Sequence, residues 1–131
     1  MLEAAALCLA MNMYHEARGE GLKGMMTVAE VTMNRVASDK FPDKVCEVVK
    51  QGYEIGRKDC QFSWYCDGES DKMSERHWRN NAYELAVDYL TGLETNFTKG
   101  ATHYHATYVN PYWSKHLTKT AQIGTHIFYK E

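Results

Sequence analysis

Hydrophobic residues at helical spacing dominate the first part of the chain. Residues 2–18 are rich in alanine, leucine and methionine and contain neither glycine nor proline. This composition favours an α-helix, so the sequence predicts a first helix over residues 2–18. Gly19, Gly21 and Gly24 follow and predict a short flexible elbow.

Three further helical patterns follow the elbow. Residues 25–37 carry an apolar stripe suited to core packing. Residues 43–50 predict a short helix that presents three valines. Residues 73–90 repeat apolar side chains at helical spacing, and Gly92 lies just past them, where helices often end.

The remaining segments lack a helical period. Residues 52–70 mix glycine, charged and aromatic residues, which predicts a loop with a short strand at 61–65. Residues 101–109 alternate between tyrosines on one side and histidines on the other, and residues 123–129 predict a closing strand. With no repeat or linker, residues 1–131 are expected to form one mainly helical (α+β) domain with a small extended portion.

Composition and charge narrow the classes of partner. Hydrophobic residues make up 44% and charged residues 24% of the 131, a balance typical of a folded globular domain. The formal net charge of -2 gives no basic field for nucleic acid. No apolar run is long enough to span a bilayer, so we expect no membrane insertion. The start has no basic n-region, so no signal peptide is predicted.

Four cysteines are too few to be a disulfide framework for a domain of this size. Cys8 lies in the first apolar helix and is most simply a small core residue. Cys60 and Cys66 bracket a short loop, and a bridge between them, or one to Cys46, fits the spacing. Four cysteines allow three full pairings, and the sequence leaves all of them open.

The candidate catalytic group is Glu16, in the last turn of the apolar first helix beside Tyr14 and His15. Desolvation disfavours the charged form of a carboxyl group, so its proton should be held more tightly than in water. That is what a general acid needs near neutral pH. The alternative is a solvated glutamate paired with Arg18 or Arg35.

A second carboxylate is less clearly marked. Glu20 follows Glu16 by four residues but lies beyond the first glycine of the elbow, and we expect it to cap the second helix or to pair with Arg35. Further candidates lie in the middle loop: Glu54, Asp59 and Asp67.

Zinc and thiol chemistry are the competing interpretations. His15-Glu16 begins a metalloprotease-like pattern, but Gly19 occupies the position of the second histidine ligand. Two cysteines and two histidines, at 60, 66, 103 and 105, match no usual zinc spacing. The same residues would suit a cysteine-dependent amidase or peptidase, which requires an activated thiolate. We therefore predict no metal and no cofactor.

The aromatic side chains fall into two groups. Those at helical spacing, Trp78 and Tyr89, are expected in the core. Those in or beside polar segments are candidates for a groove that stacks on sugar rings; they are Trp64, Tyr104, Tyr108 and Trp113.

Clusters of residues along nearly the whole chain resemble the SleB-like cell wall hydrolases, the spore-cortex-lytic family. The clearest cluster is Tyr14-His15-Glu16-Ala17-Arg18-Gly19-Glu20. The others, in chain order, lie at 8–10 with Asn12, 28–31, 34–36, 41–42, 45–46, 60–64, 66–68, 100–106, 111–113 and 123–129.

The resemblance implies a lysozyme-like catalytic domain that cuts peptidoglycan glycan strands at the MurNAc-GlcNAc β-1,4 bond. It implies a lytic transglycosylase giving 1,6-anhydroMurNAc ends, with a muramidase using water as the alternative. Glu16 would be the catalytic acid, supported by Glu20 and Tyr14. Together with the aromatic pattern, it places candidate substrate-binding residues at Gln61, Phe62, Ser63, Trp64, Tyr104, His105 and Trp113.

Spore enzymes of this family usually carry a leader and a separate wall-binding domain, and this sequence shows neither. The sequence therefore favours a minimal, monomeric catalytic domain, either of the phage endolysin type or one from which a leader or binding domain has been removed. Such a protein is made in the cytoplasm, is released by a holin if it is phage-encoded, and acts on the cell wall in the periplasm or outside the cell.

Overall fold

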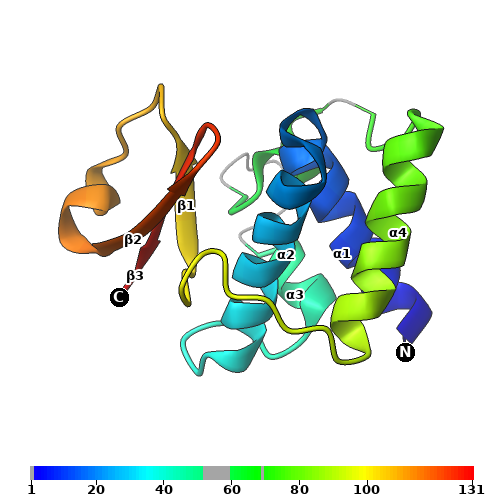
Figure 1. Cartoon of the computed structure of the whole chain (residues 1–131), viewed down its shortest axis with the longest axis horizontal. Helices are drawn as coiled ribbons and strands as arrows, with labels where there is room; N and C mark the ends of the chain where they lie inside the picture. The colour runs from blue at the N-terminus through cyan, green and yellow to red at the C-terminus, as the bar shows by residue number, and fades with distance from the viewer. Residues whose placement is uncertain (1, 52–59, 69) are drawn as a thin grey trace.

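The structure, a computed structural model, describes residues 2–51, 60–68 and 70–131. Four α-helices form one part of the molecule, and a three-stranded sheet lies beside them at one end (Figure 1). The elements are α1 (Leu2–Ala17), the 3-10 turn η1 (Arg18–Glu20), α2 (Gly21–Ala37), α3 (Val45–Val49), η2 (Ser63–Cys66), α4 (Arg76–Leu90), β1 (His103–Ala106), η3 (Tyr112–His116), β2 (Thr118–Ile123) and β3 (His126–Lys130). The mainly helical α+β class expected from the sequence is confirmed.

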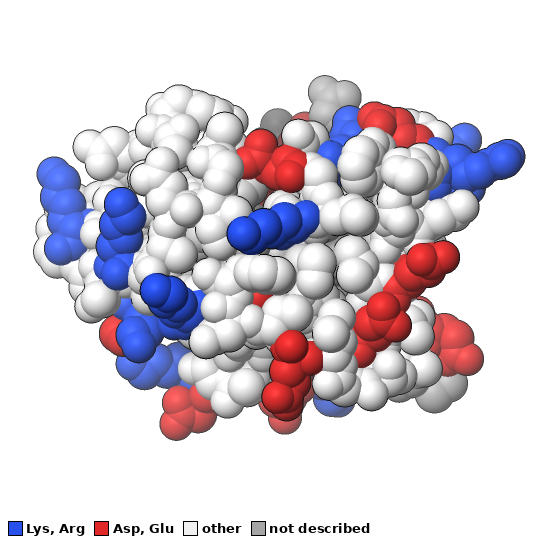
Figure 2. Space-filling view, viewed as in Figure 1, with Lys and Arg blue, Asp and Glu red and all other residues white. Residues whose placement is uncertain are grey.

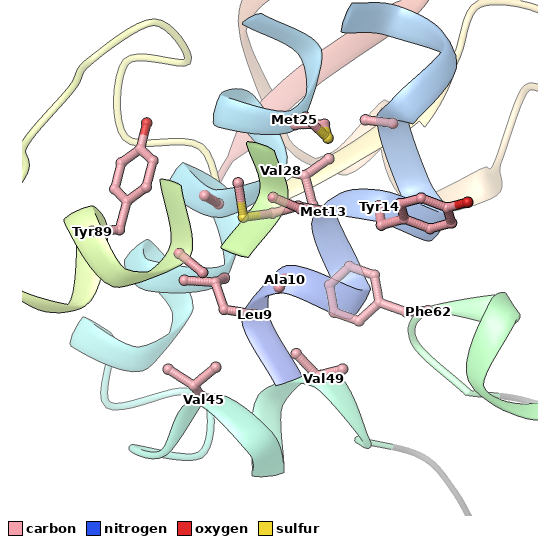
Figure 3. Close-up of a cluster of buried hydrophobic side chains, with 14 of the residues drawn as sticks. Leu9, Ala10, Met13, Tyr14, Met25, Val28, Val45, Val49, Phe62 and Tyr89 are labelled. Atoms are coloured by element: carbon pink, nitrogen blue, oxygen red, sulfur yellow. The ribbon is translucent and has the colours of Figure 1, made fainter. Parts of the chain in front are cut away.

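Helix α1 lies at the centre of the helical part and packs against α2, α3 and α4. Leu9, Ala10 and Met13 on α1 are fully buried, and Met25 and Val28 of α2 meet them in the core (Figure 3). Small alanine side chains on α1 and α4 let the helices approach closely. The core therefore fixes the direction in which the last turn of α1 points.

Two disulfides tie the helical part together. Cys8 of α1 is bonded to Cys46 of α3, with the two Cα atoms 5.3 Å apart. Cys60 is bonded to Cys66 across the loop that contains η2. Cys8 is thus a cross-link between helices, which corrects the expectation of a plain core residue.

The glycine elbow is shorter than the sequence suggested. It consists of η1, and α2 already begins at Gly21, so Gly24 lies inside the helix. A Cβ atom at Gly24 would lie 2.2 Å from the Cβ of Glu20. Gly24 is therefore required by the close approach of η1 to α2 and not by flexibility.

The sheet has the order β1-β3-β2, with antiparallel pairing throughout. The predicted closing strand 123–129 is in fact the end of β2, a turn at Gly124 and Thr125, and most of β3. Gly124 has a φ of 57°, which favours glycine at this turn. The sequence analysis missed β2, because its mixed polar residues lack a clear alternation.

Three other predicted segments also differ. The segment 61–65 is not a strand but leads into the 3-10 helix η2, and the extended region 101–109 contributes only the four residues of β1 to the sheet. Helix α4 begins at Arg76 instead of residue 73. Residues 52–59 of the predicted middle loop, with Glu54 and Asp59, lie outside the described residues.

The inner face of the sheet docks on α2. Phe128 and Ala101 are fully buried against Val31. Two side chains of α2 reinforce this contact: Asn34 Nδ2 donates to the Ala101 carbonyl at 2.8 Å, and Arg35 Nε donates to the Thr102 carbonyl at 2.7 Å. This docking brings β1 against the C-terminal end of α1. No helix in the described part of the chain has both the length and the apolarity to cross a bilayer.

Candidate active site

Glu16 lies at the junction of the helical part and the sheet. Its carboxyl group is largely buried, and the hydroxyl of Tyr104 on β1 donates a hydrogen bond to Glu16 Oε1. Burial raises the pKa of Glu16 above the ordinary value of 4.5, and the Tyr104 hydrogen bond and the charge of Arg35 only partly offset this rise. The arrangement suits a carboxyl group that releases and accepts a proton near neutral pH.

Tyr104 is a fixed donor to this carboxyl group. Its ring packs on His126 and Phe128, with centroids 5.0 and 5.6 Å away. Burial, together with the neighbouring Glu16, holds the pKa of Tyr104 well above its usual range, so the hydroxyl keeps its proton. Because Oε1 of Glu16 accepts this bond, Oε2 is left as the atom that can deliver a proton.

Arg35 is the positive charge that acts on both Glu16 and Tyr104. Its guanidinium lies over the rings of Phe41 and Phe62, 4.8 and 5.1 Å from their centroids. Burial lowers the pKa of Arg35, while Tyr104 and Glu16 raise it, and a guanidinium remains charged under such conditions. The sequence analysis treated Arg35 as part of a scaffold ion pair, but no such pair is found among the described residues.

Glu20 is engaged elsewhere. Its Oε1 accepts hydrogen bonds from the Thr125 amide at 2.7 Å and from Thr125 Oγ1 at 2.9 Å. These bonds lower the pKa of Glu20, so it is a carboxylate at neutral pH. A Cβ atom at Gly124 would lie 2.5 Å from the same oxygen. Glu20 therefore neither caps α2 with its side chain nor pairs with Arg35, as the sequence had suggested; it fastens the β2–β3 turn to η1.

A hollow opens beside Glu16. A cavity of about 440 Å³ is lined by Glu16 and, among others, by His15, Glu75 and Trp78. A second cavity of about 280 Å³ shares His15 and Arg18 with the first and reaches the segment 70–74. Trp78 was expected in the core; its partly buried side chain does pack against the core, and it also lines this hollow.

The loop around η2 supports the site from within. Trp64 is 7% exposed; its Nε1 donates to Asn12 Oδ1 at 2.8 Å, and its ring stacks on His15 at 4.8 Å. Phe62 is 3% exposed. Both rings are covered and form no open stacking surface here, and the role of Phe62 and Trp64 in substrate binding stays a prediction.

Tyr14 connects the end of α1 to the start of α4. Its hydroxyl accepts a hydrogen bond from the Glu75 amide at 2.9 Å, and Arg18 Nε pairs with Glu75 Oε1 at 2.8 Å. This contact agrees with a supporting position for Tyr14, whose role in catalysis stays a prediction.

His105 and Trp113 lie on the other face of the sheet from Tyr104. His105 Nε2 lies 2.8 Å from the Tyr129 hydroxyl, and Trp113 packs against His103 and His105 at 5.3 and 5.7 Å. These contacts hold η3 against the sheet. The structure does not bring these two residues to Glu16, and their role in substrate binding stays a prediction, as it does for the exposed Gln61 and Ser63.

Residues 19–129 match the cell wall hydrolase family. The chain belongs to this family. The resemblance noted from the sequence is confirmed, and more than nine-tenths of the chain takes part in the similarity to the individual relatives described next.

Two spore cortex-lytic enzymes are similar in sequence to this chain. That of Halalkalibacterium halodurans is 32% identical over 92% of this chain and 33% of its own length. That of Oceanobacillus iheyensis is 31% identical over 93% of this chain and 40% of its own length. The chain thus spans a third to two-fifths of these relatives.

Two solved structures share the fold. The catalytic domain of the germination-specific lytic transglycosylase SleB from Bacillus anthracis is 27% identical, with a TM-score of 0.72 over 96% of this chain and 93% of that one. The catalytic domain of the Bacillus cereus SleB protein gives the same identity and TM-score over 97% of this chain and 91% of that one.

A cysteine-dependent amidase or peptidase mechanism has no nucleophile in this structure. All four cysteines are in disulfides, which leaves no free thiolate. Among residues 2–51, 60–68 and 70–131, no three histidine, cysteine or acidic side chains are grouped as metal ligands. Of the remaining candidate carboxylates, Asp67 is exposed just after η2.

Sequence reasoning missed three contributors to the site. Arg35 was assigned to the scaffold, Trp78 to the core, and Asn12 received no role, although it accepts the bond that fixes Trp64. A signal existed for Asn12, because a lone amide in an otherwise apolar helix needs a hydrogen-bond partner once it is buried.

Proposed function

We propose that this chain is a catalytic domain, residues 1–131, that cleaves peptidoglycan glycan strands at the MurNAc-GlcNAc β-1,4 bond as a lytic transglycosylase. The observation that carries the proposal is the buried carboxyl group of Glu16, held by Tyr104 at the junction of helices and sheet. Membership of the cell wall hydrolase family and the similarity to lytic transglycosylase SleB support it.

The first step uses Glu16 as an acid. Oε2 gives its proton to the glycosidic oxygen while the bond from C1 of MurNAc to that oxygen breaks, which leaves an oxocarbenium-like centre at C1. The leaving GlcNAc gains a hydroxyl group. Tyr104 continues to donate to Oε1 and stabilises the carboxylate that forms.

The second step uses the same group as a base. The Glu16 carboxylate takes the proton of the C6 hydroxyl of MurNAc while that oxygen bonds to C1 and closes the 1,6-anhydro ring. Glu16 regains its proton and no water is consumed. This route needs one carboxyl group, which agrees with the engagement of Glu20 by Thr125 and of Glu75 by Arg18.

The disulfides bear on the compartment in which the reaction takes place. Disulfides persist in oxidising compartments, so the two bridges support action on the wall outside the cytoplasmic membrane. A monomer is sufficient, since Glu16, Tyr104 and Arg35 come from one chain. The endolysin setting and release by a holin stay predictions.

The decisive experiment combines a variant with product analysis. Glu16→Gln should keep the fold, because the amide oxygen can still accept from Tyr104, but should lower the release of soluble muropeptides about 100-fold or more, the usual worth of a general acid. Mass spectrometry of the wild-type products should show anhydro ends, which are one water lighter than reducing ends.

Each outcome has one meaning. Full lysis by Glu16→Gln would end the proposed role of Glu16. Reducing ends would establish a muramidase that uses water instead of the C6 hydroxyl. Cut stem peptides with intact glycan would indicate an amidase or peptidase, and binding of sacculi without release would indicate a binding module.

A further inference from the structure

The interface between α2 and the sheet contains a buried cation. Arg35 is 4% exposed, and its Nη1 atom is buried with no hydrogen-bond acceptor among the residues that the structure describes. Its Nε donates to the Thr102 carbonyl at 2.7 Å, two residues before Tyr104. A buried charge without a carboxylate contact is costly, so its retention calls for an explanation.

Among the residues that the structure describes around Glu16, Arg35 is left as the cation available to it. Tyr104 faces Glu16 from β1, and His126 of β3 packs against the Tyr104 ring with the centroids 5.0 Å apart. On α1 itself, His15 Nε2 donates to the Asp71 carbonyl at 2.8 Å. In η1, Arg18 is paired with Glu75 and Glu20 is held by Thr125.

We propose that Arg35 is a positioning residue for the reaction, with two effects. It fixes the backbone that carries Tyr104, through the Thr102 carbonyl, and its positive charge stabilises the Glu16 carboxylate formed as the glycosidic bond breaks. This inference rests on the proposed function and deepens it.

Among the described residues Arg35 makes no direct ion pair with Glu16, which explains why its charge can stabilise the carboxylate without removing the acid. A direct ion pair would keep Glu16 deprotonated and unable to act as an acid. Arg35 instead bonds to Thr102 and lies against Phe41 and Phe62, so burial still decides the direction of the Glu16 pKa. The carboxylate forms in the first step, so a charge that stabilises it lowers the first barrier. Burial offsets that charge and keeps the carboxylate basic enough to take the C6 proton in the second step.

The chain offers a matched set of variants. Arg35→Met keeps the apolar stem between the two rings but removes the charge and the Nε donor, and Arg35→Gln removes the charge while keeping a donor. Arg35→Lys keeps the charge. Asn34→Ala is the control, because it removes the neighbouring bond from α2 to the same segment, at Ala101, without changing any charge.

The first readout does not depend on activity. In protein labelled with ¹³C at glutamate carboxyl groups, the Glu16 signal, assigned by its loss in Glu16→Gln, gives the pKa of Glu16 directly. It should rise by about one pH unit or more in Arg35→Met. Arg35→Lys and Asn34→Ala should stay near the wild-type value. If Arg35→Met does not fold by circular dichroism, Arg35→Gln carries the test.

The second readout is the pH profile of muropeptide release. Because a general acid is lost above its pKa, the basic limb should move to higher pH in Arg35→Met, while the maximal rate falls about tenfold or more. Asn34→Ala should lower the free energy of unfolding but leave the basic limb of the pH profile at its wild-type position.

An unmoved Glu16 pKa in the charge-removing variants would overturn the inference, as would an equal shift in Asn34→Ala. A second combination of results is also informative: the Glu16 pKa moves in Arg35→Met, but the wild-type protein releases no fragments. That combination would overturn the proposed function and leave the electrostatic coupling between Arg35 and Glu16 standing.

Discussion

Glu16 combines two opposing influences within a few side chains. Burial favours its protonated form, while the Tyr104 hydroxyl and the charge of Arg35 favour its carboxylate. A group that is first an acid and then a base needs neither form to dominate strongly. The residue-level design is thus a buried carboxyl group whose proton affinity is moderated by one hydrogen bond and one displaced cation.

Glu16 should reduce the stability of the domain as the pH rises. Its folded-state pKa is raised, so the folded state resists ionisation, and stability falls as the pH rises from about 4.5 through the raised pKa. Glu16→Gln should therefore be more stable than wild type by about 1–2 kcal/mol at pH 8 and equal to it at pH 4. Urea unfolding at both pH values measures this; a destabilised variant at pH 8 would contradict it.

At the scale of elements, the elbow matters because it adds a polar link between the helical part and the sheet. Glu20, at the end of η1, holds the β2–β3 turn through Thr125, and the segment before β1 is bound by Asn34 and Arg35 of α2. Tyr104 reaches Glu16 only while the sheet keeps this position. The site is therefore assembled by polar contacts at the edge of the sheet as well as by the apolar contact with Val31.

Glu20→Gln should loosen the turn with the opposite dependence on pH. The pKa of Glu20 is lowered in the folded state, so its contribution is present above about pH 4.5 and is lost as the pH falls through the lowered pKa. At pH 7 the variant should show about tenfold faster hydrogen exchange at the Thr125 amide, the loss expected when a charged acceptor is removed.

The control for this comparison is exchange at His105, the β1 residue opposite Ile127, whose amide follows the same alternation as that of Thr107, the donor to the Thr125 carbonyl. It should change less than exchange at Thr125. Equal protection of Thr125 in both proteins would show that Glu20 does not hold the turn.

At the scale of the whole molecule, the two disulfides differ in what they constrain. Cys8–Cys46 spans 38 residues and joins α1 to α3, whereas Cys60–Cys66 spans six and closes a local loop. A cross-link stabilises chiefly by restricting the unfolded chain, and the restriction grows with loop length. The longer bridge is therefore the one that supports the fold as a whole.

Paired cysteine substitutions should show which disulfide contributes more to the free energy of unfolding. Removing Cys8 and Cys46 together, each replaced by alanine, should lower the free energy of unfolding by about 4 kcal/mol, and removing Cys60 and Cys66 together by about 2 kcal/mol. Guanidinium unfolding at pH 7 measures both. A larger loss from the short loop would show that native contacts of η2, and not chain restriction, set the order.

Charge is unevenly placed over the whole molecule. On the face shown in Figure 2, basic side chains gather over the sheet and acidic ones over the lower part of the helices. Residues 97–131 contain four lysines, Lys99, Lys115, Lys119 and Lys130, against a single carboxylate side chain, Glu131. The overall net charge of -2 thus hides a basic sheet beside an acidic helical part.

Much of the helical part could be predicted from the sequence, because helical periodicity records which face of each segment is buried. The bounds of α1 were predicted to within a residue, and the apolar run that ends in Glu16 correctly indicated a buried carboxyl group with a raised pKa. The resemblance of the motifs to cell wall hydrolases gave the family. These features depend on residues that are close together in the chain.

Only the tertiary structure decided the partners of those residues. Tyr104 lies 88 positions from Glu16, and Thr125 lies 105 from Glu20. The disulfide pairing, the true position of β2 and the burial of Trp64 likewise depend on contacts between distant segments. Local pattern fixes which face of a segment is apolar, but not which segment will cover it. The sequence therefore singled out Glu16 as the candidate acid, and the packing of the sheet on α2 decided how that carboxyl group is held.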